Sequence, residues 1–420
     1  MDLIETFGAK IGALSEEKPQ RARQLLTAGF RANGVKNKLA SKRSSKSDRM
    51  LFQLVNRAMV TCLAKPQSNV MVSLFTPCEM LHLQGLHPYS CEGFSSYLSG
   101  AMAEQPFLHQ AEDTGIPNSL CSYHKVFIGA AQMGLMPKPR FILSTSLACD
   151  ANTLTFRHLA QFYDVPHFNV DSPFESSPQA VDYVAGQLRQ MGEFLTQQTG
   201  LPLDDGQLAR TVARSQRTMA LYHRGLRLRA GRQVLSDLTS ELLRTAAFHF
   251  LLGTPETEAY ARQLLREITT APPAQGKQLL WIHTTPYWVA PLRHLFAQST
   301  RVQVAACDMS YEGIVEADPT KPYEAMARRL VYSPFNGPAQ RRIDRALEMA
   351  KTVGADGAVW FCHWGCKHTL GGARLGKKAL EEAGLPTLLL DGDSCDRGFG
   401  GEGQAATRME AFLEVLEGMA

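Results

Sequence analysis

The feature that most restricts the fold is an alternation of short, β-branched apolar runs with segments of helical periodicity. The first runs cover residues 69–75, 141–146 and 166–170, and each leads into a segment rich in Cys, Pro, Asp or Gly. Helical periodicity follows each of them. This alternation predicts βαβ units and a parallel sheet.

The same alternation returns after a long stretch that has only helical periodicity. Further apolar runs cover residues 278–284, 302–306, 357–361 and 386–391. We therefore predict an α/β protein with two lobes, each built on a parallel sheet. The predicted segments are a helical N-terminal part, a first βα lobe, a helical insertion or bridge and a second βα lobe, at residues 1–67, 68–176, 177–272 and 273–420.

The two halves of the chain also resemble each other. A strand followed by Thr-Pro occurs as SLFTPCE and again as WIHTTPYW. A strand, a cysteine, a helix and a strand ending in Asp occur as FILSTSLACD to VPHFNVD and as AVWFCHWGC to LPTLLLD. This likeness favours an internal duplication, although short strands are similar enough for chance to produce it.

Composition excludes several classes of protein. The chain has 420 residues, of which 44% are hydrophobic and 20% charged, so it is not disordered or fibrous. The net charge of +4 does not require a nucleic acid or a membrane as partner. The basic stretch 31–49 is interpreted as a solvated linker or helix face, with docking of an acidic partner as the alternative. With no apolar run of membrane-spanning length and no signal peptide, we expect a cytoplasmic protein.

Nine cysteines in a chain expected in a reducing compartment favour metal or redox chemistry over disulfides. Ligands of open α/β sheets gather beyond the carboxyl ends of the strands. Six cysteines lie at or near such positions and are the candidate metal ligands: Cys78, Cys121, Cys149, Cys362, Cys366 and Cys395. Cys307 also follows a strand and is the reserve ligand, whereas Cys62 and Cys91 are interpreted as structural.

The cysteine positions leave three interpretations open. An iron–sulfur cluster between the lobes would take thiolates from both of them. A zinc site could use Cys362, Cys366 and Cys395 with His363 or His368, although the paired C-x2-C spacing of zinc knuckles is missing. The third interpretation is a set of inert buried cysteines.

Several motifs resemble those of the 2-hydroxyacyl-CoA dehydratase and benzoyl-CoA reductase superfamily. They are TPCE (76–79), CSYHK (121–125), LACDAN (147–152), VPHFNVDSP (165–173), HWGCK (363–367) and DGDSCDRGFGGEGQAATRMEAFLE (391–414), in the same order along the chain. The resemblance implies two Rossmann-like or flavodoxin-like lobes with an iron–sulfur cluster between them. It also implies a separate activator protein, which hydrolyses ATP and supplies low-potential electrons.

Within this superfamily, two cofactors are expected from the resemblance. Dehydratase subunits carry one [4Fe-4S] cluster on cysteines that match Cys78, Cys121 and Cys149. The three further cysteines resemble those of double-cubane proteins, which implies an [8Fe-9S] cofactor on all six. We therefore expect an iron–sulfur oxidoreductase, a homodimer of anaerobic metabolism, that reduces a small unsaturated substrate. The alternatives are a dehydratase (lyase) subunit with a dissimilar partner subunit, and a non-catalytic zinc or iron–sulfur scaffold.

Residues that flank the candidate ligands are the natural proton donors for such a site. Glu79, His124, His363 and His368 are the catalytic candidates, although Glu79 could instead cap a helix and the histidines could be structural donors. Lys367 and the other flanking lysine, Lys125, are expected to offset the charge of the cofactor. A near match to the P-loop, GGARLGKK (371–378), lacks the final hydroxyl, so we assign ATP hydrolysis to the partner.

Overall fold

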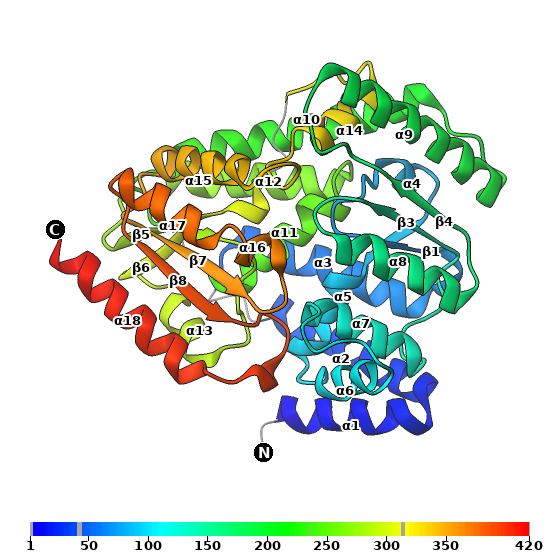
Figure 1. Cartoon of the computed structure of the whole chain (residues 1–420), viewed down its shortest axis with the longest axis horizontal. Coiled ribbons are helices and arrows are strands. Elements are labelled where there is room, and N and C mark those ends of the chain that lie inside the picture. Colours follow the sequence, from blue (N-terminus) through cyan, green and yellow to red (C-terminus); the bar gives the residue numbers. More distant parts are fainter. Residues whose placement is uncertain (1–2, 40–43, 235, 312–315, 420) are drawn as a thin grey trace.

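The computed structural model describes residues 3–39, 44–234, 236–311 and 316–419, and it contains two four-stranded parallel sheets (Figure 1). The first sheet has the strand order β2-β1-β3-β4 and the second the order β6-β5-β7-β8. The strands are β1 (Asn69–Val72), β2 (His87–Ser90), β3 (Phe141–Thr145), β4 (His167–Val170), β5 (Lys277–Ile282), β6 (Val302–Cys307), β7 (Gly357–His363) and β8 (Thr387–Gly392). The predicted α/β class with two parallel-sheet lobes is confirmed.

The two sheets have the same topology, because β1 to β4 take the same places as β5 to β8. Each strand pairs in parallel with its neighbours. The chain must therefore return from the end of one strand to the start of the next, and all strands of a sheet have their carboxyl ends at the same edge. In each lobe the strand order reverses between the first and the third strand, where an open sheet binds its ligand. This common order supports an internal duplication.

Two local predictions about strands need correction. Strand β2, with the sequence His-Pro-Tyr-Ser, matches none of the predicted runs. It is only four residues long and contains Pro, which a strand tolerates at the edge of a sheet, so it has no apolar run to recognise. Strand β7 extends to His363, so Cys362 lies within the strand and does not follow it.

Helices cover both sheets and join the lobes. They are α1 (Leu3–Glu17), α2 (Pro19–Leu39), α3 (Lys46–Ala64), α4 (Glu79–Leu83), α5 (Cys91–Gly100), α6 (Gln105–Asp113), α7 (Ser122–Gln132), α8 (Asp150–Tyr163), α9 (Pro178–Thr199), α10 (Asp205–Leu228), α11 (Leu238–Phe250), α12 (Pro255–Thr270), α13 (Ala290–Phe296), α14 (Pro322–Val331), α15 (Ala339–Val353), α16 (Lys367–Leu370), α17 (Ala373–Glu382) and α18 (Glu402–Gly418). Short 3-10 helices lie at Pro66–Ser68 (η1), Asp308–Ser310 (η2) and Arg397–Phe399 (η3). No helix within the described ranges is both long and apolar enough to cross a membrane.

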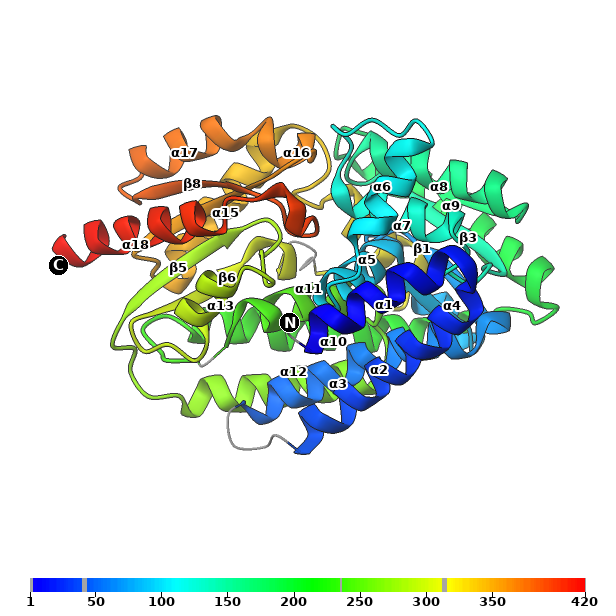
Figure 2. The same ribbon diagram turned by 90° about the horizontal axis from the view of Figure 1, so that it is seen from below.

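The helices outside the sheets connect the two lobes. Figure 2 shows α1, α2 and α3 along one side of the molecule, and α3 packs against α11 and α12 of the middle segment. The middle helices α9 and α10 pack against α14 of the second lobe. One hydrophobic cluster contains Leu51, Val70, Tyr222 and Leu280, and so takes a residue from each of the four predicted segments. The segment boundaries stay a prediction.

The basic stretch 31–49 lies partly on helices. Lys36 and Lys38 occupy the last turn of α2, where cations interact favourably with the helix dipole. Ser45 caps the start of α3, and residues 40–43 between the two helices lie outside the described residues.

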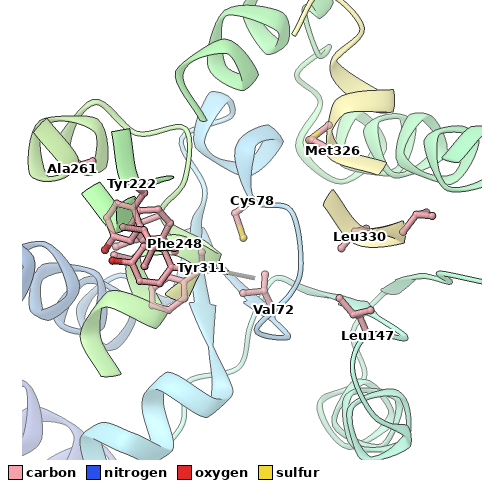
Figure 3. Close-up of a cluster of buried hydrophobic side chains, with 14 of the residues drawn as sticks. Val72, Cys78, Leu147, Tyr222, Phe248, Ala261, Tyr311, Met326 and Leu330 are labelled. Carbon is pink, nitrogen blue, oxygen red and sulfur yellow. The ribbon is translucent and has the colours of Figure 1, made fainter. Parts of the chain in front are cut away.

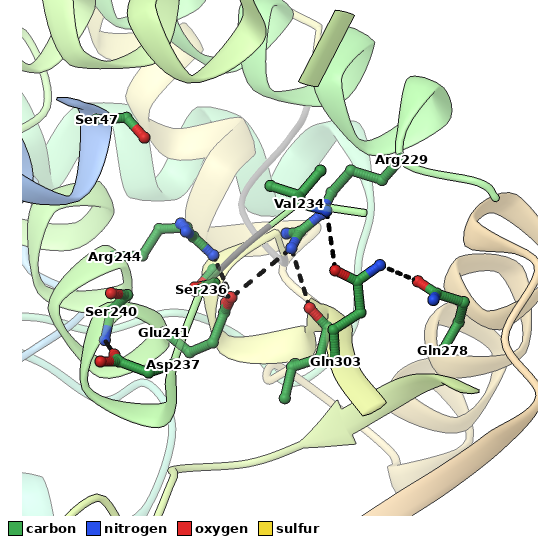
Figure 4. Close-up of polar contacts among 12 residues, drawn as sticks. Ser47, Arg229, Val234, Ser236, Asp237, Ser240, Glu241, Arg244, Gln278 and Gln303 are labelled. Atoms are coloured by element: carbon green, nitrogen blue, oxygen red, sulfur yellow. Dashed lines mark hydrogen bonds and ion pairs between the residues drawn. The ribbon is translucent and has the colours of Figure 1, made fainter. Parts of the chain in front are cut away.

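A buried polar network fixes the middle helices against the second sheet (Figure 4). Glu241 lies between the guanidinium groups of Arg244 and Arg229, and all three side chains are almost fully buried. Arg229 also donates to the carbonyl of Val304 in β6 at 3.0 Å, and Arg244 donates to Tyr260 at 3.0 Å. Because buried charges are costly unless they are paired, this network requires α10, α11 and β6 to keep one arrangement.

Candidate functional site

A cavity of about 1460 Å³ lies between the lobes at the carboxyl ends of their strands. Its wall includes Phe75 after β1, Ala148 after β3, Met309 after β6 and Gly365 after β7. Phe7 of α1 is also part of the wall, so the N-terminal helices enclose one side. The cavity therefore occupies the position at which both sheets are expected to bind a ligand.

Three of the six candidate thiols line this cavity: Cys121, Cys149 and Cys366. Each of them is the N-cap residue of a helix, α7, α8 and α16 respectively. Burial raises the pKa of each thiol, and backbone N–H groups in the first turn of its helix act in the opposite direction. Such N–H groups stabilise a thiolate or a sulfide because they carry the partial positive charge of the helix start.

Without a cation, the three thiols are held in their protonated form. Burial and then the nearby Cys366 raise the pKa of Cys149 to about 12. Burial, followed by Cys366, Asp393 and Cys149, raises the pKa of Cys121 well above its ordinary value. Thiolates at this place therefore need a positive counter-charge, which metal ions supply.

His363 lies beside Cys121 and is oriented by its second ring nitrogen. Its Nδ1 accepts a hydrogen bond from the backbone N–H of Ser394 at 3.1 Å, so in the neutral ring the proton is on Nε2. Nε2 is 3.2 Å from the Cys121 sulfur and can donate to it. Burial lowers the pKa of His363, which favours this neutral form.

The other three candidate thiols do not line the cavity. Cys78 caps α4 and is packed among buried hydrophobic side chains (Figure 3), with its sulfur 3.2 Å from the carbonyl oxygen of Thr76. Cys362 precedes the cavity residue His363 in β7, and successive side chains of a strand point to opposite faces. Cys395 is fully buried, with its sulfur 3.7 Å from the carbonyl oxygen of Ser95.

The reserve ligand, Cys307, is also outside the cavity lining. It ends β6, is buried, and its sulfur lies 3.4 Å from the carbonyl oxygen of His283. Cys62 and Cys91, the two cysteines predicted to be structural, are fully buried in the hydrophobic cluster of the first lobe.

The flanking candidates also divide into two groups. His124, His368 and Lys367 line the cavity together with His363. The two remaining candidates do not line it, since Glu79 forms a two-point ion pair with Arg329, at 2.7 and 3.0 Å, and Lys125 pairs with Glu112 at 2.6 Å.

Two cavity residues, Glu92 and His283, were missed by the sequence predictions. Glu92 is in the first turn of α5, where its carboxylate accepts bonds from the Ser90 hydroxyl at 2.8 Å and the Leu74 N–H at 3.3 Å. Burial raises its pKa. Glu92 follows β2, so recognition of that short strand would have placed it at a strand end.

The donor set does not suit a single metal ion. Among the described residues, no group of three or more His, Cys, Asp or Glu side chains is arranged to hold one ion. Zinc binds thiolates at about 2.3 Å, so its ligands lie very close together. In an iron–sulfur cluster the thiolates bind different iron atoms and lie farther apart. Three thiols at helix N-cap positions around a large cavity fit an iron–sulfur cluster better than they fit a zinc ion.

Two other motifs have structural explanations. In GGARLGKK only Gly371 and Gly372 precede α17. Gly376 and both lysines lie inside this helix, so the segment is not a phosphate-binding loop. In the segment DGDSCD (391–396), Asp393 accepts bonds from the Ser122 hydroxyl at 2.6 Å and from the N–H groups of Cys395 and Asp396 at 2.7 Å.

Comparison with known proteins agrees with this architecture. The model of the 2-hydroxyglutaryl-CoA dehydratase D-component family matches residues 73–416. The alpha subunit of (R)-phenyllactyl-CoA dehydratase from Clostridium sporogenes is 21% identical over 337 residues, covering 74% of this chain and 80% of the relative. The family match begins directly after β1 and includes the other seven strands and every cysteine that lines the cavity. The chain therefore belongs to the 2-hydroxyglutaryl-CoA dehydratase D-component family.

Proposed function

We propose that this protein is the iron–sulfur subunit of a dehydratase that removes water from a 2-hydroxyacyl-CoA thioester. Membership of the dehydratase family supports the reaction class. The observation that carries the proposal is the set of three thiols at helix N-cap positions, Cys121, Cys149 and Cys366, around one large and mostly apolar cavity. Such a cavity has room for both a cluster and a thioester.

The cofactor in this proposal is one [4Fe-4S] cluster held by Cys121, Cys149 and Cys366. Cys366 takes the place of Cys78 in the expected set of Cys78, Cys121 and Cys149, because Cys78 does not line the cavity. Three protein ligands leave one iron atom without a cysteine, and an open coordination position is what a metal site needs to act on a substrate. When bound there, the cluster would supply a single electron of low potential to the thioester, the chemistry that loss of the hydroxyl group requires.

The residues of the chain have separate roles. His363 donates a hydrogen bond to the Cys121 sulfur and so stabilises negative charge on it. Glu92 is the proposed general base, because burial raises the pKa of a carboxylate that faces the cavity. The apolar part of the wall excludes water, which protects a strongly reducing site from side reactions.

The expected [8Fe-9S] reductase is the competing proposal. It requires Cys78, Cys362 and Cys395 as further ligands, and these thiols are buried and do not line the cavity. We rank it second for this reason. In both proposals an activator protein that hydrolyses ATP supplies the electron. A dissimilar second subunit is part of the dehydratase proposal, since the relative is an alpha subunit, whereas the reductase is proposed as a homodimer.

Iron analysis tests the cofactor. The protein is purified without oxygen, reconstituted with iron and sulfide, and compared with six single Cys→Ala variants. We expect about four iron atoms per chain, lost in C121A, C149A and C366A and retained in C78A, C362A and C395A. Circular dichroism checks that each variant is folded.

The other outcomes each have a clear meaning. About eight iron atoms that disappear in C395A would favour the double cubane, and zinc alone would contradict both proposals. The reaction itself is tested by following water loss from (R)-phenyllactyl-CoA and 2-hydroxyglutaryl-CoA with an activator, a reductant and the second subunit present. Absence of turnover with every 2-hydroxyacyl-CoA tried would contradict the dehydratase assignment.

A further inference from the structure

His283 is a cavity residue with an unusual backbone. It directly follows β5, at the position where a ligand is expected, and its φ is +84°, a conformation that non-glycine residues rarely adopt. Its own N–H donates to Asp308 Oδ1 at 2.7 Å, and its carbonyl accepts from Cys307. These contacts hold the backbone in a conformation that the chain would otherwise avoid.

A buried ion pair fixes the imidazole of His283. Asp308 Oδ2 accepts from Arg342 Nε at 2.8 Å, so one carboxylate holds both the His283 backbone and the Arg342 guanidinium. The guanidinium of Arg342 lies over the ring of Phe335, and its central carbon, Cζ, is 4.5 Å from the ring centroid. Its two outer nitrogens face Nδ1 of His283 at 3.5 Å and Nδ1 of His368 at 3.3 Å.

This arrangement determines which ring nitrogen carries the proton. Arg has five donors and no acceptor, so both histidines must accept at Nδ1 and carry their proton on Nε2. In His368 the Nε2–H group is used, because it donates to the carbonyl oxygen of Phe335 at 3.2 Å. In His283 no described residue hydrogen bonds to Nε2, and this atom is not among the buried unpaired ones.

We propose that His283 is a catalytic hydrogen-bond donor, whose Nε2–H binds the thioester oxygen of the substrate while that oxygen carries negative charge. Asp308 and Arg342 are its positioning residues. The inference rests on the proposed dehydratase function. The His283 ring is 6.0 Å from that of His363, which itself contacts Cys121, so the donor lies beside the proposed cluster site.

The step requires no proton transfer from His283. When the carbonyl carbon of the thioester accepts one electron, its oxygen becomes an oxyanion, and the N–H group is then a stronger partner for it than for the neutral carbonyl. In the dehydration the C2–O bond breaks and the hydroxyl group leaves, and Glu92, the proposed base, takes the proton lost from C3. The electron supplied by the activator passes back from the product to the protein, so the dehydration is redox-neutral overall. Burial and the charge of Arg342 lower the pKa of His283 and keep its ring neutral.

The test compares two amide substitutions at this position. His283→Gln can place an N–H group near the position of Nε2, whereas His283→Asn is too short to reach it. His82→Gln is the control, because His82 also uses one ring nitrogen for a bond to a backbone carbonyl, at Phe250, but lies outside the cavity lining. We expect kcat to fall about 10²-fold in H283N, with a much smaller fall in H283Q, none in H82Q, and an unchanged iron content in all three.

A second measurement does not depend on turnover. Butyryl-CoA with a ¹³C-labelled thioester carbonyl lacks the hydroxyl group and cannot react, so its bound C=O stretch can be recorded by infrared difference spectroscopy. We expect a lower frequency in the wild type and H283Q than in H283N. Arg342→Lys, which keeps the charge but loses the planar fork, should move the stretch in the direction of H283N.

The outcomes separate the two proposals. Turnover and a bound C=O stretch in H283N equal to those of the wild type would overturn the role of His283 and leave the dehydratase intact. If the wild-type protein neither binds the thioester nor dehydrates any 2-hydroxyacyl-CoA, the proposed function itself is wrong, and the inference fails with it.

Discussion

At the scale of single residues, Asp48 shows how burial changes the ionisation of a side chain. It lies in the first turn of α3, and its N–H group bonds to the capping Ser45 hydroxyl at 3.0 Å. Burial raises the pKa of its carboxyl group from 3.8 to about 6, although Arg244 acts in the opposite direction. The folded protein therefore binds this proton more tightly than the unfolded chain does.

This raised pKa predicts a pH-dependent effect of Asp48→Asn. Between pH 4 and pH 6 the unfolded chain loses the proton while the folded protein keeps it, so the contribution of Asp48 to stability falls as the pH rises. The variant cannot ionise. We expect it to be more stable relative to the wild type at pH 7 than at pH 4, by roughly 1–3 kcal/mol. Urea unfolding at both pH values measures this, and a difference independent of pH would contradict it.

Single residues also show what the sequence could not predict about the site. The end of a strand can be recognised from its apolar run, but the face on which the next side chain lies cannot. Strand β7 continues to His363, so this histidine reaches the cavity and Cys362 does not. Cys78 and Cys121 both cap helices, yet only Cys121 lies on the cavity wall. Their difference comes from tertiary packing, which a short motif does not contain.

At the scale of elements, long apolar runs were predictable and short amphipathic ones were not. Strands such as β3, in which every residue is buried, show their burial in the sequence. Strand β2 has the sequence His-Pro-Tyr-Ser and is defined by its pairing with β1, a contact that local sequence does not reveal. Because β2 was missed, so was Glu92, which lies two residues beyond its end.

Helix α7 carries Cys121 at its start and depends on close packing against α6. A Cβ atom added at Gly129 would lie 1.9 Å from the carbonyl oxygen of Phe107. Alanine normally stabilises a helix interior relative to glycine by about 1 kcal/mol. At this position the two helices must separate, so we expect Gly129→Ala to lower the melting temperature and to weaken cluster retention.

The matched control for this substitution is Gly186→Ala in α9. A Cβ atom at Gly186 meets no other atom within 4 Å, and its backbone is helical. We expect this variant to melt at the same or a higher temperature, because only the helix propensity changes. Calorimetry on both variants separates the two effects, and a stabilising Gly129→Ala would show that α6 and α7 are not in rigid contact.

At the scale of the whole molecule, the cavity is enclosed by lobes that are already joined by polar contacts. Ser122 of the first lobe donates to Asp393 of the second at 2.6 Å, and Gln105 donates to Asp396 at 2.7 Å. Arg397 of the second lobe pairs with Glu104 of the first at 2.8 Å. A cluster held by the proposed ligands would add a further link between the lobes, since Cys121 and Cys149 belong to the first lobe and Cys366 to the second.

A cluster bound by both lobes should therefore stabilise the molecule as a unit. A ligand that binds only the folded state raises stability by mass action, so removal of the cluster with a chelator is expected to lower the melting temperature of the wild type. C395A, which keeps all three proposed ligands, should show the same decrease, and C366A should show none because it has no cluster to lose. Calorimetry with and without the chelator measures this. An equal decrease in C366A would mean that the second lobe does not hold the cofactor through Cys366.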